Sequence, residues 1–215
     1  MSINRRHALS ILGSGAALGL PTSVSAAAQP VRFDHGVASG DPSASGAVLW
    51  TRATSEGTQD APLDWHVATS ANGKPVKSGR AIARAARDHT AKVEVTRLQP
   101  GRDYWYWFEG ADGQRSPVGR FRTLPRGEVA DVVLAAVSCQ SYTGGFFNAY
   151  DALSKLPRVD VVLHLGDYIY EYGQSGFGGD TGSKIGRIVE PNHEILTLAD
   201  YRARHAQVKR DPDMQ

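Results

Sequence analysis

The sequence predicts a β-sandwich followed by the start of an α/β domain. Short alternating or β-rich runs with turn signals between them recur as far as residue 125, a rhythm typical of an antiparallel sandwich. Beyond it, continuous apolar runs replace the alternation, as in strands buried on both faces of a parallel sheet. The 215 residues are 41% hydrophobic and 21% charged, which excludes a disordered or collagen-like polymer and allows one to two globular domains.

The beginning of the chain has the layout of an export signal. Arg5 and Arg6 precede an uncharged apolar run from Ala8 to Leu20, and Val24–Ala26 supplies a small-x-small cleavage pattern. The paired arginines predict a twin-arginine signal peptide over residues 1–26, and the apolar run is too short for a stable membrane anchor. We therefore expect a partner in the twin-arginine export machinery and a periplasmic or secreted protein.

Charge and cysteine content exclude further classes. The chain has 24 Lys and Arg against 22 Asp and Glu, and this net charge of +2 argues against nucleic acid or an anionic membrane as the main partner. Residues 1–26 contain two arginines and no acidic residue, so the mature chain is expected to be neutral. The single cysteine excludes an internal disulfide.

Residues 31–125 carry the pattern of the sandwich. Strands are expected over Ala47–Arg52, Leu63–Ser70, Val76–Ile82, Ala91–Leu98, Tyr104–Phe108 and Val118–Thr123. The segment Leu98–Tyr104 resembles the tyrosine corner of fibronectin type III and immunoglobulin-like sandwiches, in which a Tyr hydroxyl ties a crossing between strands to the backbone. The period of two places Tyr104, Tyr106 and Phe108 on one face of their strand, and one face is expected to be core.

Residues 129–215 begin a different kind of domain after the linker 123–128. Val129–Val137 and Val159–Leu165 read as buried parallel strands with a helix over Phe146–Leu156 between them, which makes a βαβ unit. A further helix is expected over Asp200–Val208.

Polar residues follow both strands of this unit. Cys139 comes after the first strand, and Asp167 and Tyr170 come after the second. Ligands gather beyond the carboxyl ends of parallel strands, so these side chains are expected to converge. A thiolate, a bridging carboxylate and a phenolate together suit trivalent iron. Each residue alone also has a structural interpretation: a small buried hydrophobe, a loop cap and a packed aromatic.

Six stretches resemble the alkaline phosphatase D (PhoD-like) family of exported metallophosphatases. The most specific are VSCQ at 137–140 and LHLGDYIYEY at 163–172; the others lie at 33–42, 48–52, 146–150 and 198–207. The resemblance implies an N-terminal sandwich, a metallophosphoesterase domain, and hydrolysis of phosphomonoesters or phosphodiesters, so the expected partners are small-molecule phosphate esters. It also implies an iron ion beside calcium, with Cys139 and Tyr170 as iron ligands and Asp167 bridging iron and calcium.

The ligand set is incomplete in this sequence. A two-metal phosphoesterase needs about six or more protein ligands, and three are matched. We therefore expect residues 129–215 to be the N-terminal part of a truncated metallophosphatase domain that lacks activity alone, and we assign no catalytic residue. The alternative is a non-catalytic periplasmic sandwich that binds phosphorylated or carbohydrate ligands.

Other polar features have structural interpretations. His35 and Asp41 are expected to cap loops and hydrogen-bond rather than to bind metal, because their neighbours are turn formers. His164, inside an apolar strand, is expected to pack in the core. We do not read Pro191–Glu194 as a metal motif, because it lacks the glycine and the preceding strand of a Gly-Asn-His-Glu motif.

Two later segments are expected to lie outside any packed core. The Gly-rich segment Tyr172–Ile188 lacks periodicity and predicts a mobile loop near the mouth of the site. Arg202 and Arg204 are expected to be solvated or salt-bridged on the last helix.

Overall fold

Strands β1 to β9 occupy the part of the chain whose sequence alternates. The computed structural model describes residues 30–55 and 59–215, so the predicted signal peptide lies outside the described residues. The elements are β1 (Val31–Arg32), β2 (Val37–Ser43), β3 (Gly46–Arg52), β4 (Thr54–Ser55), β5 (Ala61–Ala68), β6 (Pro75–Ala83), η1 (Ala85–Arg87), β7 (Thr90–Val95), β8 (Asp103–Gly110) and β9 (Gly119–Arg122).

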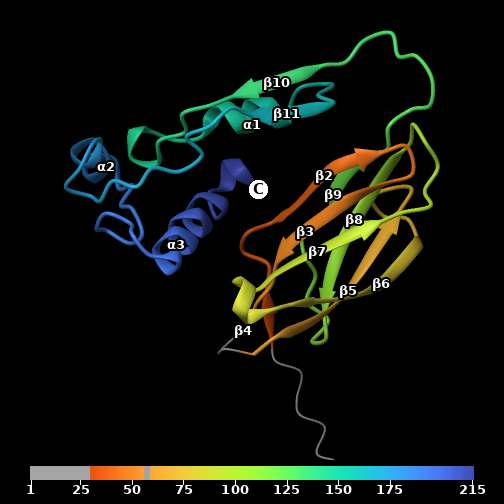
Figure 1. Cartoon of the computed structure of the whole chain (residues 1–215), viewed down its shortest axis with the longest axis horizontal. Helices are drawn as coiled ribbons and strands as arrows, with labels where there is room; N and C mark the ends of the chain where they lie inside the picture. Colours follow the sequence, from red (N-terminus) through yellow and green to blue (C-terminus); the bar gives the residue numbers. More distant parts are fainter. Residues whose placement is uncertain (1–29, 56–58) are drawn as a thin grey trace, which may run out of the picture.

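Two antiparallel sheets form the sandwich (Figure 1). One sheet has the order β2-β3-β7 and the other the order β6-β5-β8-β9, while β1 and β4 form a separate short pair. The sheets enclose a core of apolar side chains, among them Leu49 from the first sheet and Val67 and Phe108 from the second. The prediction of an all-β sandwich is therefore consistent with the observed architecture. We refer to β1 to β9 as the sandwich.

Strand β8 shows how the sequence pattern becomes packing. Tyr104, Tyr106 and Phe108 are all buried in the core, as the period of two predicts. Trp107 lies on the opposite face, where its ring stacks with His66 at 5.2 Å. The hydroxyl of Tyr104 accepts a hydrogen bond from the backbone N–H of Gln99 at 2.9 Å, which confirms the tyrosine corner.

Strand β2 was not predicted. Its sequence VASGDPS contains residues that disfavour strands, and the register with β3 shifts between Gly40 and Ser43. Asp41 has a φ of 47° within that irregularity. Pairing of β2 with the strongly apolar β3 overrides the local preference of these residues for turns.

The chain then forms a strand–helix–strand unit and four further helical elements. These are β10 (Leu134–Val137), η2 (Tyr142–Gly144), α1 (Asn148–Ser154), β11 (Val161–His164), α2 (Gly179–Ile185), α3 (Leu198–Lys209) and η3 (Pro212–Met214). Strands β10 and β11 pair in parallel from Leu134 opposite Val161 to Val137 opposite His164. We refer to β10 to η3 as the second region.

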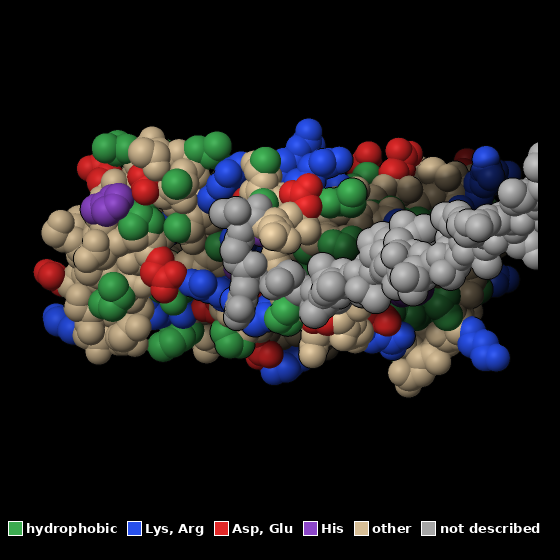
Figure 2. Space-filling view, turned by 90° about the horizontal axis from the view of Figure 1, so that it is seen from below, with side chains coloured by type: hydrophobic (Ala, Val, Ile, Leu, Met, Phe, Trp, Pro, Cys, Tyr) green, Lys and Arg blue, Asp and Glu red, His purple; other side chains and the backbone are tan. Residues whose placement is uncertain are grey.

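The expectation that these two strands are buried on both faces was wrong for the described chain. Leu134, Val162 and Leu163 are exposed, because β10 and β11 form a two-stranded sheet that no other described strand joins. Figure 2 shows hydrophobic side chains scattered over the end of the molecule where the second region lies. On the same face, acidic and basic side chains are interspersed.

The later helices also differ from expectation. Within the segment expected to be a mobile loop, α2 forms, beginning after Gly178 and ending at Gly186, both with left-handed backbone conformations. Helix α3 begins with a capping box, in which the Thr197 side chain accepts from the backbone N–H of Asp200 and the Asp200 side chain accepts from the backbone N–H of Thr197. It is two residues longer at its beginning and one at its end than predicted.

Helix α3 lies against the sandwich (Figure 1). The Lys209 ammonium is 5.0 Å from the centre of the Trp50 ring, and the Arg202 guanidinium donates to the carbonyl of Ala86 at 3.1 Å. Among the described residues, no helix is long and apolar enough to cross a membrane.

Candidate metal centre

The candidate site lies where β10 and β11 end side by side. Backbone pairing continues past both strands, because the N–H of Cys139 donates to the carbonyl of Gly166 and the N–H of Gln140 donates to that of Asp167, each at 3.1 Å. The carboxyl ends of the two strands therefore bring Cys139 and Asp167 to the same edge of the sheet, as the sequence predicts.

Both residues leave their strands in a conformation that is unusual outside glycine. Cys139 has a φ of 58° and Asp167 a φ of 53°. Asp tolerates the left-handed region, whereas it costs a Cys residue about 1–3 kcal/mol of backbone strain. Such strain persists only where the surrounding structure holds it, and it often marks a functional site.

The three predicted ligand side chains meet at one atom. The Cys139 thiol donates to Oδ2 of Asp167 at 3.4 Å, and the Tyr170 hydroxyl donates to the same oxygen at 3.2 Å. Cys139 and Asp167 are exposed, so the cluster is open to solvent from their side. The structure thus brings together all three residues that the sequence singled out.

The surroundings of the cluster change the pKa of the phenol. Desolvation, followed by hydrogen bonds to Cys139 and Asp167 and their charges, raises the pKa of Tyr170 to about 12. The phenol therefore keeps its proton at neutral pH while it donates to Asp167. A cation that replaced this proton and the thiol proton would meet a thiolate, a carboxylate and a phenolate within reach of one point.

The donor set fits a metal ion only when the phenol is included. In the described residues, no group of three or more His, Cys, Asp and Glu side chains is placed to hold a metal. Cys139 and Asp167 supply two donors of that kind, and Tyr170 supplies a third donor of a different kind.

Gln140, next to Cys139, forms hydrogen bonds that stabilise the backbone around the site. It is buried, and its side-chain N–H donates to the carbonyl of Tyr168 at 2.8 Å, across the gap between the two strand ends. Its side-chain oxygen accepts from the Tyr150 hydroxyl and from Nε2 of His164, the latter at 3.2 Å.

His164 is half-buried and hydrogen-bonded beside the site, so its expected place in the core was wrong. Only the short distance of these residues from Cys139 and Asp167 in the sequence could have indicated this role.

The remaining candidates lie elsewhere. His35 is buried at the sandwich, where Nη1 of Arg52 lies 2.8 Å from its Nε2, in keeping with the expected hydrogen-bonding role. Pro191 and His193 offer backbone carbonyls to the guanidinium of Arg204. Arg204 itself is 2% exposed, so the expectation of a solvated or salt-bridged side chain was wrong.

Two family models match successive parts of the chain. The model described as PhoD-like phosphatase, N-terminal domain, matches residues 19–125, and the model described as PhoD-like phosphatase matches residues 134–215. The boundary between the matches falls in the segment that joins the sandwich to β10.

Two relatives agree with the family models. Alkaline phosphatase D of Bacillus subtilis (strain 168) is 38% identical over 193 residues, which cover 85% of this chain and 32% of that protein. A solved structure of PhoD superposes with a TM-score of 0.76 at 37% identity, over 87% of this chain and 37% of that one. The chain thus spans about a third of the length of the relatives it matches, and it belongs to the PhoD-like phosphatase family.

Proposed function

We propose that this chain forms the N-terminal part of an exported, metal-dependent phosphatase that hydrolyses phosphomonoesters or phosphodiesters. The observation that supports the proposal most is the convergence of the Cys139 thiol and the Tyr170 phenol on one oxygen of Asp167, at 3.4 and 3.2 Å. Membership of the PhoD-like family supports a phosphatase role.

The proposed organisation has three parts. Residues 1–26 are the twin-arginine signal peptide, residues 31–125 are the sandwich domain, and residues 129–215 are the beginning of an α/β metallophosphatase domain. The parallel pairing of β10 and β11 around α1 supports the last assignment.

Cys139 and Tyr170 would hold iron, and Asp167 would bridge iron and calcium. Metals bound there would hold the phosphate, neutralise charge in the transition state and activate an oxygen nucleophile. Cys139 and Tyr170 each contribute a removable proton, at Sγ and Oη, and Asp167 accepts both hydrogen bonds. Gln140 would keep the two strand ends at a fixed separation through its hydrogen bond to Tyr168.

Three ligands leave most of a two-metal coordination sphere unfilled, since such sites use about six or more protein ligands. We expect this chain alone to hydrolyse p-nitrophenyl phosphate no faster than its Cys139→Ala, Asp167→Ala double variant. Clear metal-dependent turnover by the unaltered chain would contradict this part of the proposal.

A chimera tests the phosphatase role. Residues 30–215 would replace the matching third of Bacillus subtilis alkaline phosphatase D, and hydrolysis of p-nitrophenyl phosphate and bis(p-nitrophenyl) phosphate would be measured. We expect activity that Cys139→Ala and Tyr170→Phe each lower by about 100-fold or more, through loss of a metal ligand. Tyr172→Phe is the matched control, because its exposed ring stacks on Tyr170 at 6.2 Å but takes no part in the cluster. Equal activity of the Tyr170 and Tyr172 variants would overturn the ligand assignment.

Export is tested separately. Residues 1–30 fused to a folded reporter should carry it across the cytoplasmic membrane, and the Arg5→Lys, Arg6→Lys double variant should retain it inside. Reporter that is exported equally by both fusions would contradict the twin-arginine route.

A further inference from the structure

The guanidinium of Arg204 is buried and surrounded by backbone carbonyls. It donates to the carbonyls of Tyr170, Tyr172 at 3.0 Å, Glu190 at 3.1 Å, Pro191 at 2.8 Å and His193 at 3.4 Å. No carboxylate in the described part of the chain forms a salt bridge with it. Burial lowers the pKa of Arg204, which shows the cost of holding this charge away from water. The five carbonyls compensate that cost by hydrogen bonding.

These carbonyls belong to two segments that lack regular structure. One segment follows β11 and includes Tyr170 and Tyr172, and the other precedes α3. Backbone hydrogen bonds join them in two places, from Gln174 to Asn192 at 2.7 Å and from Ile195 to Glu171 at 3.0 Å. Arg204 lies between the two segments and donates to both, so it connects the segment that contains Tyr170 to α3.

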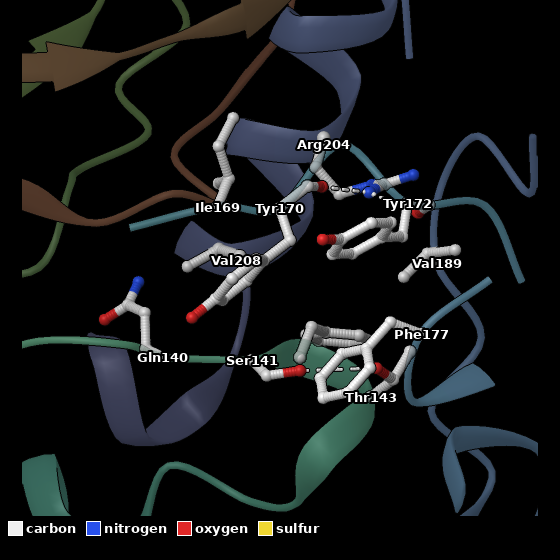
Figure 3. Close-up of a pocket in the computed structure, with 11 residues that line it drawn as sticks. Gln140, Ser141, Thr143, Ile169, Tyr170, Tyr172, Phe177, Val189, Arg204 and Val208 are labelled. Carbon is white, nitrogen blue, oxygen red and sulfur yellow. Dashed lines mark hydrogen bonds between the residues drawn. The ribbon is translucent and has the colours of Figure 1, made fainter. Parts of the chain in front are cut away.

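The same residue carries the tied carbonyl and the phenol of the candidate site. Figure 3 shows the guanidinium beside the backbone of Tyr170 and Tyr172, with the Tyr170 ring on the other side of its backbone. The phenol then reaches Oδ2 of Asp167 at 3.2 Å. A hydrogen bond to the carbonyl restrains the backbone of Tyr170, and the side-chain torsions of Tyr170 then set the position of its hydroxyl.

We infer that Arg204 is a positioning residue that holds the Tyr170 phenol against Asp167 by binding the backbone of residues 170–172 from α3. The role of Tyr170 as a metal ligand rests on the proposed function. The hydrogen bonds by which Arg204 holds residues 170–172 do not depend on it. The hydrogen bonds of Arg204 go to backbone carbonyls and not to the side chains of Cys139, Asp167 or Tyr170, so it acts through the loop.

Two substitutions of Arg204 test the inference in the full chain. Arg204→Lys keeps the charge but can reach fewer carbonyls, and Arg204→Met keeps the apolar stem without any donor. Arg202→Lys and Arg202→Met are matched controls, because Arg202 lies on the same helix and donates to Ala86 in the sandwich instead. Near-ultraviolet circular dichroism of the buried aromatic side chains would show that the sandwich remains folded in all four variants.

The first readout needs no metal. Hydrogen exchange of the amides in residues 170–174 and 192–195 should accelerate by about 10-fold or more in both Arg204 variants and remain unchanged in the Arg202 variants. Unchanged exchange in Arg204→Met would overturn the inference.

The second readout is spectroscopic. Addition of Fe3+ to the unaltered chain should produce a visible phenolate-to-iron absorption that Tyr170→Phe abolishes, and Arg204→Lys should weaken the apparent Fe3+ affinity by about 10- to 100-fold. An unaltered chain that gives no such absorption would contradict the proposed iron ligands, while the exchange result would still decide whether Arg204 holds the loop. Equal Fe3+ affinity of the unaltered chain and both Arg204 variants would overturn the positioning role.

Discussion

The sandwich and the second region are stabilised by different kinds of buried side chain. The sandwich encloses a continuous apolar core to which Leu49, Val67 and Phe108 each contribute fully buried side chains. In the second region, the largest fully buried side chain is that of Arg204, and the ion pair of Arg187 with Asp211 is also buried. Apolar burial is tolerant of small shifts, whereas a buried polar group is costly as soon as one partner is lost. The candidate site therefore depends on a few directional contacts, while the sandwich does not.

The largest effect is expected in the sandwich core. Phe108 is fully buried, and Phe108→Ala should lower the free energy of unfolding of the sandwich by about 3–5 kcal/mol, through lost burial and the cavity left behind. Denaturant unfolding followed by Trp fluorescence measures this. Phe177→Ala is the control, since Phe177 is 74% exposed in the second region and its loss should change stability by less than about 0.5 kcal/mol. Similar effects of the two substitutions would refute the contrast between the regions.

A buried ion pair provides the corresponding test in the second region. Nη1 of Arg187 donates to Oδ2 of Asp211 at 2.8 Å, with both side chains buried, and the guanidinium lies 3.8 Å from the centre of the Tyr142 ring. Asp211→Asn leaves the arginine charge unpaired and should destabilise this region by about 3 kcal/mol. Hydrogen exchange of residues 141–147 and 187–189 would measure the loss.

The matched control for that pair is on the surface. Glu190 pairs with Arg210 in an exposed position, so Glu190→Gln should cost no more than about 1 kcal/mol. Exchange rates that rise equally in Asp211→Asn and Glu190→Gln would show that burial does not strengthen the dependence on the pair.

The difference between the regions also explains what the sequence could predict. Alternation located six strands of the sandwich, and the tyrosine corner identified Tyr104, because apolar burial leaves a periodic pattern. The βαβ pattern placed Cys139 and Asp167 at one sheet edge, because parallel strands end together. Arg204 was missed because its partners are backbone carbonyls, which leave no pattern in the sequence, and a buried arginine on a polar helix looks like a solvated one.

The junction between the two regions gives a pH-dependent prediction. Burial, followed by the positive charges of Arg52 and Arg210, lowers the pKa of His35 from 6.5 to about 4, while Asp34 and Asp88 raise it to a smaller extent. The unfolded chain therefore binds a proton at this residue between about pH 6.5 and pH 4 that the folded chain does not. The contribution of His35 to the free energy of unfolding is fully present above pH 6.5, and it is lost as the pH is lowered through that window.

The expected loss from His35 is about 2 kcal/mol between pH 8 and pH 5. Burial also lowers the pKa of His205, which contributes in the same direction. Denaturant unfolding at several pH values should show that the free energy of unfolding of His35→Gln changes less steeply with pH than that of the unaltered chain. An identical slope in His35→Gln would show that His35 does not carry the pH dependence.

The smallest effect is expected at the tyrosine corner. Tyr104 is buried in the core, and its hydroxyl accepts one hydrogen bond from Gln99 at 2.9 Å. Tyr104→Phe keeps the packing of the ring and leaves the N–H of Gln99 without this partner, so the sandwich should lose about 1 kcal/mol. Tyr172→Phe, in the second region, should leave the unfolding of the sandwich unchanged. A loss at Tyr104 as large as that of Phe108→Ala would mean that the sandwich, like the second region, depends on single directional contacts. A loss of about 1 kcal/mol would instead mean that the hydrogen bond adds a small local stabilisation to a fold that apolar burial already stabilises.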